Sequence, residues 1–119
     1  MKDNFLFEYV ETKTFQEQLK KLCRSLEEEN AIKDYVGEFR NYGDPINKYN
    51  IRKIRFPIKG KGKRGGARII YYFTEKTDDS FILFFTIYTK GEKEDLTEKE
   101  IKLLVDYLQF YLQKRRKEP

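Results

Sequence analysis

Three consecutive segments with the composition of β-strands constrain the fold of this chain more than any other feature of its sequence. Residues 51–57 alternate between two faces, with Ile54 and Phe56 on the same one. Residues 68–74 and 80–90 are rich in isoleucine, tyrosine and phenylalanine, which favour strands. The connectors are short and polar, so we expect the three strands to form antiparallel hairpins.

Before these strands, the sequence predicts a short strand and a helix. Residues 5–10 alternate as a strand does. Thr14 and Glu17 have the spacing of a capping box, and apolar residues recur at helical spacing from Phe15 to Leu26. This pattern predicts an amphipathic helix of about 15 residues.

Two further helices complete the pattern. One is marked by apolar positions within residues 32–39, ahead of a turn at residues 41–45. The other begins at a second capping box, formed by Thr97 and Glu100, and continues through residues 101–108. We therefore predict an α+β fold in which a small antiparallel sheet is flanked by helices, in the order βααβββα.

Composition limits both the size of the fold and its chemistry. The chain has the length of one domain, so we expect residues 1–119 to form a single domain. With no histidine and one cysteine, a Cys/His zinc site and a histidine-activated nucleophile are excluded. No metal or other cofactor is expected, and any proton transfer falls to Lys, Arg, Tyr, Glu or Asp.

The N-terminus lacks the apolar run of a signal peptide, and no run of about 18 apolar residues occurs that could span a membrane. A single cysteine cannot form an internal disulfide. These features favour the cytoplasm and no membrane partner.

Positive charge is concentrated in residues 48–68, which we call the basic segment. No acidic residue lies between Asp44 and Glu75. The basic segment holds nine of the 25 basic residues, which leaves 16 basic against 20 acidic residues elsewhere. The nine are Lys48, Arg52, Lys53, Arg55, Lys59, Lys61, Lys63, Arg64 and Arg68. Such a concentration of charge attracts polyanions, so nucleic acid is the first expected partner and an acidic protein the second.

A glycine-rich loop at residues 60–66 lies within the basic segment. It matches the G-x-G-x-x-G pattern, but a dinucleotide-binding turn needs a helix after the loop and a strand follows here. It is not a P-loop, because Lys-Ser/Thr does not follow the last glycine. Two interpretations fit the pattern. One is a flexible hairpin loop that its charges keep soluble, and the other is a loop whose backbone approaches phosphates closely.

Three motifs together resemble the RelE/HigB toxin family of bacterial type II toxin–antitoxin systems. The resemblance is strong over residues 51–105, and it departs from the family at Phe56, where Trp is frequent, and at Gly91, where Asn or Ser is common. The motifs are Arg52-Lys-Ile-Arg-Phe-Pro57, Gly62-Lys-Arg-Gly-Gly-Ala-Arg-Ile-Ile-Tyr-Tyr-Phe73 and Thr86-Ile-Tyr-Thr-Lys-Gly-Glu-Lys-Glu-Asp-Leu-Thr97.

The resemblance implies a RelE-like fold and an endoribonuclease that cleaves mRNA in the ribosomal A site without a metal. It implies contacts with ribosomal RNA and inhibition by a cognate antitoxin protein, with operator DNA reached only through that antitoxin. In metal-free RNA cleavage the substrate 2′-OH attacks the adjacent phosphorus, so the enzyme must orient it, stabilise phosphoryl charge and handle two protons.

Four residues are candidates for catalysis. Arg68, a planar cation, suits the phosphate, and Arg64 is a second candidate for that role. Tyr88 is a candidate to stack a base or transfer a proton, although its ordinary pKa of about 10 makes it a poor base unless cations lower it. Lys90 is a candidate general base or acid, because neighbouring cations depress the pKa of a lysine.

Alternation along the strands predicts where these side chains lie. Arg68 shares a face with Ile70, and Tyr88 and Lys90 share a face with Phe84. If the strands pair, Arg68 and Tyr88 meet at one end of the sheet. The opposite face of the last strand is predicted to be core, with Leu83, Phe85 and Ile87.

Further basic residues are candidates to bind RNA phosphates: Arg55, Lys59, Lys61, Lys63 and Lys93. Structural interpretations stay open beside these. For Tyr88 the structural interpretation is an ordinary aromatic residue at a sheet edge. For Lys90 and Lys93 it is that they are solvated residues paired with nearby glutamates. A nucleic-acid-binding module without catalysis, and a domain whose basic face docks an acidic protein, are the alternative functions.

Overall fold

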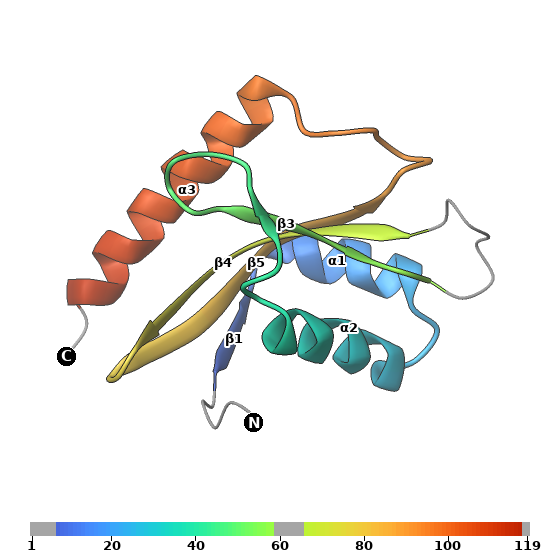
Figure 1. Ribbon diagram of the computed structural model, residues 1–119, viewed down its shortest axis with the longest axis horizontal. Coiled ribbons are helices and arrows are strands. Elements are labelled where there is room, and N and C mark those ends of the chain that lie inside the picture. The colour runs from blue at the N-terminus through green and yellow to red at the C-terminus, as the bar shows by residue number, and fades with distance from the viewer. Residues whose placement is uncertain (1–6, 59–65, 118–119) are drawn as a thin grey trace.

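The computed structural model describes residues 7–58 and 66–117, which form an α+β domain with a mixed sheet and helices on both faces (Figure 1). The α+β class predicted from the sequence is confirmed. The elements are β1 (Glu8–Glu11), α1 (Lys13–Leu22), α2 (Leu26–Glu38), β2 (Asp44–Pro45), β3 (Arg52–Phe56), β4 (Ala67–Lys76), β5 (Asp79–Thr89) and α3 (Glu98–Lys117).

The sheet differs from the predicted one at both edges. Its strand order is β1-β5-β4-β3-β2, and β1 runs parallel to β5 whereas the other neighbours are antiparallel. The sheet is therefore mixed. β1 can lie beside β5, at the opposite edge from β2, because the connection through α1 and α2 is long enough to cross the sheet. The predicted turn at residues 41–45 contains the additional short strand β2, where Asp44 pairs with Lys53.

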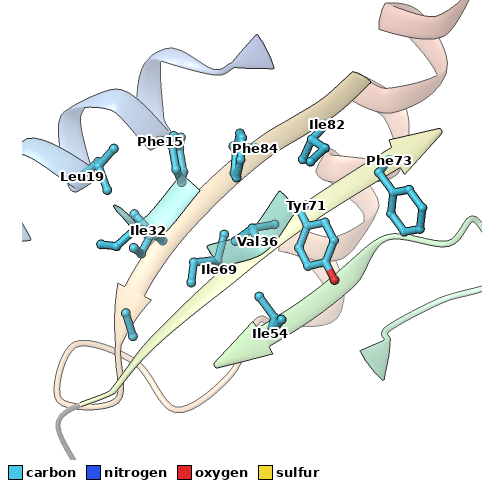
Figure 2. Close-up of a cluster of buried hydrophobic side chains, with 12 residues drawn as sticks. Phe15, Leu19, Ile32, Val36, Ile54, Ile69, Tyr71, Phe73, Ile82 and Phe84 are labelled. Atoms are coloured by element: carbon cyan, nitrogen blue, oxygen red, sulfur yellow. The ribbon is translucent and has the colours of Figure 1, made fainter. Parts of the chain in front are cut away.

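The two faces of the sheet carry separate cores. Figure 2 shows the first, in which Phe15 of α1 and Val36 of α2 pack against Ile69, Tyr71 and Phe84 of the sheet. The α1–α2 layer covers this face, and α3 covers the opposite one. The second core contains Ile51, Ile70, Phe81, Leu83, Phe85, Tyr88 and Leu108. Both faces of β5 are consequently buried.

A β-bulge interrupts the pairing of β4 with β5. Ile70 pairs with Thr86, but the next residue of β4, Tyr71, pairs with Phe84. Phe85 is thus an extra residue without a partner in β4. Bulges of this kind shift the alternation of side chains along the strand that carries the extra residue.

The bulge corrects the predicted faces of β5. Leu83 and Phe85 pack in the same core as Tyr88, on the side of α3, whereas Phe84 and Ile87 belong to the core under α1 and α2. The prediction that Tyr88 shares a face with Phe84 is therefore wrong. It failed because it assumed strict alternation, and the extra residue breaks the alternation between the two positions.

The first helix begins and ends earlier than predicted. Thr12, not Thr14, caps it, because the Thr12 hydroxyl accepts a hydrogen bond from the Phe15 amide at 3.0 Å. Ser25 then caps α2, so the chain breaks between the two helices and Leu26 starts the second one. Leu26 is 68% exposed instead of packing on the apolar stripe of the first helix.

Both ends of α3 are fixed by polar side chains. The predicted capping box is present, since the Glu100 amide donates to the Thr97 hydroxyl at 3.1 Å and the Thr97 amide donates to the Glu100 carboxylate at 2.9 Å. Near the other end, Arg115 forms ion pairs with Glu8 and Asp79, each at 2.7 Å. These pairs tie α3 to β1 and to the start of β5.

Among the helices of the described residues, α3 included, none combines the length and the apolar character that a membrane crossing requires.

We expect Tyr71→Phe to lower the free energy of unfolding by about 1–3 kcal/mol, because it leaves a buried carbonyl without its donor. Tyr71 is fully buried, and its hydroxyl donates to the Arg40 carbonyl at 2.6 Å. The matched control is Tyr42→Phe, since Tyr42 is 78% exposed and its change should cost about 0.5 kcal/mol or less. Urea denaturation of both variants measures the difference, and equal losses would contradict the role given to this hydrogen bond.

Candidate functional site

A cross-strand row at one end of the sheet brings together three of the predicted site residues. Arg55 of β3 pairs with Arg68 of β4, and Arg68 pairs with Tyr88 of β5. We call these three residues the arginine–tyrosine row. Arg68 alternates with buried residues of the α1–α2 core, so the row lies on the face that α3 covers. The predicted meeting of Arg68 with Tyr88 is confirmed.

The cations of this row differ in their surroundings. Arg68 is half-buried, and its Nη1 donates to the Gly66 carbonyl at 3.3 Å, where the described chain resumes. Arg55 is exposed. Lys53, in the neighbouring row opposite Ile70, has its ammonium 3.5 Å from the Asp95 carboxylate. The Lys53–Asp95 pair is largely solvated and contributes little stability, so it does not prevent Lys53 from meeting a phosphate.

Tyr88 is buried, and burial governs its chemistry. It is 5% exposed, and within the described residues its hydroxyl has no hydrogen-bond partner. Burial raises the pKa of Tyr88 above its ordinary value, the carboxylates of Asp95 and Glu100 raise it further, and Arg68 lowers it. The loss of solvation outweighs the arginine. Tyr88 is accordingly a neutral phenol at physiological pH, which can donate a hydrogen bond or a proton but does not act as a base.

Lys93 is placed close to Tyr88 but is engaged with an acid. Its ammonium lies 6.0 Å from the centre of the Tyr88 ring and forms an ion pair with Glu100 at the start of α3. The hydrogen bond from Lys93 is the largest cause of a lowered pKa of the Glu100 carboxyl. The structural interpretation of Lys93 as an ion-paired residue thus holds, with Glu100 as the partner instead of Glu92 or Glu94.

Lys90 lies apart from the row, in the turn that follows β5. It is exposed, and no hydrogen bond or ion pair of its side chain occurs within the described residues. Glu92 shapes this turn, because its carboxylate accepts hydrogen bonds from the Thr89 amide at 3.0 Å and the Thr89 hydroxyl at 3.1 Å. Lys90 is therefore a solvated cation two residues beyond Tyr88 in the sequence.

Four of the predicted residues fall between β3 and β4 in the sequence. Lys59, Lys61, Lys63 and Arg64 lie outside the described residues. The site that the structure describes therefore consists of the arginine–tyrosine row together with Lys53, Lys90 and Lys93.

A pocket of about 710 Å³ adjoins Tyr88 on the side away from Arg68. It lies where the start of α1, the second half of β5 and the start of α3 meet, and its lining includes Tyr88, Lys93 and Glu100. Sequence reasoning missed the contributions of Gln18 from α1 and Tyr107 from α3. Neither residue belongs to a motif, so the sequence carries no signal for either.

No protein-family model matches the chain, so the likeness to RelE/HigB toxins rests on the motifs of its strands. Among the described residues, no group of three or more acids or cysteines is arranged to hold a metal ion. The chemistry available at the site is that of guanidinium groups, ammonium groups and a neutral phenol.

We expect Arg68→Ala to raise the pKa of Tyr88 further, because it removes the cation that lowers it. NMR titration of the tyrosine ring carbons above neutral pH measures the change. Tyr72 is the internal control, since burial raises its pKa and the nearby charges are those of Arg116 and Asp79. A Tyr88 titration that is indifferent to the loss of Arg68 would contradict the row.

Proposed function

We propose that this protein is the toxin of a type II toxin–antitoxin system, a metal-independent endoribonuclease that cleaves mRNA on the ribosome. The observation that carries the proposal is the pairing of Arg68 with Tyr88 across β4 and β5, on residues that belong to the RelE/HigB-like motifs. It puts a fixed cation beside a neutral proton donor, and RNA cleavage needs both at one phosphate.

The proposed reaction is an internal transfer within the RNA. The 2′-oxygen forms a bond to the adjacent phosphorus and loses its proton, while the bond to the 5′-oxygen breaks and that oxygen gains a proton. The products are a 2′,3′-cyclic phosphate and a 5′-hydroxyl. Arg68 stabilises the charge on the phosphoryl oxygens, Tyr88 donates a hydrogen bond or proton, and Lys90 handles the second proton.

The remaining cations serve binding in this proposal. Arg55 continues the row toward β3, and Lys53 and Lys93 flank it, so RNA phosphates can follow the end of the sheet. Lys59, Lys61, Lys63 and Arg64 add charge from the loop. The proposed partners are mRNA and ribosomal RNA, together with a cognate antitoxin that inhibits the enzyme in the cytoplasm.

The fold supports this interpretation at the level of architecture. A sheet whose first strand lies parallel to its last, with two helices on one face and a final helix on the other, is the arrangement on which we base the proposal of a RelE-like fold. Within it, the three motifs of the sequence fall on β3, β4 and the second half of β5 with the turn that follows.

A nucleic-acid-binding module without catalysis is the second candidate. The observation that favours it is the burial of the Tyr88 hydroxyl beside the Lys93–Glu100 pair, which must rearrange before that hydroxyl reaches a substrate. In this case the same row binds phosphates but accelerates no reaction.

Purified protein mixed with translating ribosomes tests the proposal, and Arg68→Ala is the decisive variant. We expect the wild type to cleave mRNA and Arg68→Ala to be slower by about 10²–10³, the usual effect of losing one preorganised charge donor. The matched control is Arg24→Ala, which removes the same charge from an exposed position between α1 and α2 and should cleave as the wild type does.

Each outcome of that assay is decisive. Cleavage by the wild type that Arg68→Ala retains in full would refute the role of Arg68. Ribosome binding without cleavage by the wild type would establish the second candidate, and an absence of both would eliminate the two together.

The ends of the cleaved RNA test the mechanism separately from the residues. We expect a 2′,3′-cyclic phosphate on the upstream fragment, because the 2′-oxygen is the proposed nucleophile. Treatment of the fragment with a phosphatase, before and after opening of the cyclic ester by acid, distinguishes this end from a free phosphate. A 5′-phosphate on the downstream fragment would show attack by water and would overturn the mechanism.

A further inference from the structure

The pocket beside Tyr88 continues the arginine–tyrosine row beyond β5. β4 places Arg68 on one side of Tyr88, and no residue of β4 lines the pocket, which therefore lies on the other side. Neighbouring strands are about 4.8 Å apart, so the row crosses the sheet in short steps and ends at this pocket. A polymer that follows the row past Tyr88 reaches the pocket with its next unit.

Most charged groups in the lining are already engaged. Lys93 pairs with Glu100, and the Glu92 carboxylate accepts hydrogen bonds from Thr89. Lys13, at the start of α1, is exposed, and no ion pair of its side chain occurs within the described residues. The lining therefore offers a charged ligand one exposed lysine, and it holds no buried ion for a ligand to neutralise.

Neutral hydrogen-bonding groups of the lining are still available. Within the described residues, no hydrogen bond engages the side chains of Thr14, Gln18 and Thr86. The Gln18 carboxamide holds a donor and an acceptor side by side, and each hydroxyl can act as either. Amide and hydroxyl groups that converge on a cavity without partners suit a neutral ligand that forms hydrogen bonds.

The wall from α3 is apolar beyond Glu100 and includes an accessible aromatic ring. Leu103 and Tyr107 are 60% and 42% exposed, and the Tyr107 ring meets Phe85 edge to face at 6.2 Å between centroids. Proteins recognise unpaired RNA bases by stacking them on such rings and by hydrogen bonds to the base edges. The volume of about 710 Å³ lies within the usual range for sites of small ligands.

We propose that this pocket binds an unstacked base of single-stranded RNA, from the nucleotide next to the phosphate that Arg68 contacts. Tyr107 stacks on the base, and the Gln18 carboxamide forms hydrogen bonds to its edge. The inference rests on the proposed function for the identity of the polymer, because that function puts an RNA phosphate at Arg68. Gln18 is then a specificity-determining residue that lies outside the three motifs.

Nuclear magnetic resonance with nucleoside 5′-monophosphates tests the pocket without any cleavage. We expect the nucleotides to shift the amide signals of Gln18, Thr86 and Tyr107 in a saturable way. Ribose 5-phosphate is the control ligand, because it carries the sugar and the phosphate without the base, and it should leave these signals unchanged. Equal shifts with ribose 5-phosphate, or no saturable shift with any nucleotide, would overturn the proposal.

Stacking is tested by matched substitutions of two exposed tyrosines. Tyr107→Leu keeps an apolar side chain but removes the ring, so it should weaken nucleotide binding by about fivefold or more. Tyr42→Leu is the control, since Tyr42 is 78% exposed and does not line the pocket. Equal affinities of the two variants would show that no base stacks on Tyr107.

The role of Gln18 is tested by Gln18→Glu, which keeps the shape of the side chain and replaces its donor by a second acceptor. Guanine presents two adjacent donors on its Watson–Crick edge, so the affinity for guanosine monophosphate relative to adenosine monophosphate should rise by about fivefold or more. Gln16→Glu is the control, because it adds the same charge at an exposed position of α1 outside the lining. An unchanged ratio in Gln18→Glu would refute the contact.

The positions of the cuts on translating ribosomes separate this inference from the proposed function. If the protein cleaves mRNA, Gln18→Glu should change which base lies next to the cut, and Gln16→Glu should not. Cleavage with sites that are indifferent to Gln18 would overturn the pocket as a base site and leave the proposed function standing. Nucleotide binding in the pocket of a protein that cleaves nothing would support the base site and refute the proposed function.

Discussion

The bulge in β5 is the constraint on which the rest of the structure depends. Tyr71 and Arg68 are three residues apart on β4 and face opposite ways, whereas their partners Phe84 and Tyr88 are four apart and would face the same way on a regular strand. Both pairings can form only because Phe85 is an extra residue. The bulge thus lets one strand contribute Phe84 to the core under α1 and α2 and still turn Tyr88 toward Arg68.

Burial on both faces then sets the electrostatics of the site. A sheet covered on one side only would leave the row solvated, and its tyrosine would behave as a free phenol. Here α3 and the segment before it close over Tyr88, so desolvation dominates the nearby charges. The same closure brings Lys93 onto Glu100. The site combines cations that remain at the surface with a proton donor that is withdrawn from it.

Much of this arrangement follows from the sequence, and the exceptions have physical causes. The pattern of β3 and β4 places Arg55 and Arg68 correctly, because alternation is local and those strands are regular over these residues. The bulge leaves no signal in β5, which has the composition of a continuous run of strand-forming residues. The parallel edge at β1 and the Lys93–Glu100 pair depend on contacts that only the tertiary structure creates. Thr12 and Thr14 are equivalent in type, and the capping residue Thr12 is the one that also hydrogen-bonds to the Phe84 and Phe85 carbonyls of β5, which the sequence does not reveal.

The ion pairs of Arg115 with Glu8 and Asp79 have a consequence for the order in which the chain can fold. Arg115 and Glu8 are separated by 107 positions in the sequence, so their contact closes a loop of nearly the whole chain. During synthesis, α1, α2 and all the strands emerge before α3, and the core under α1 and α2 can form while they do. The aromatic side chains on the opposite face of the sheet stay uncovered until α3 has been synthesised. A nascent chain of this design passes through a half-covered state with the exposed apolar surface that chaperones bind, and the sheet becomes enclosed on both faces only when α3 docks.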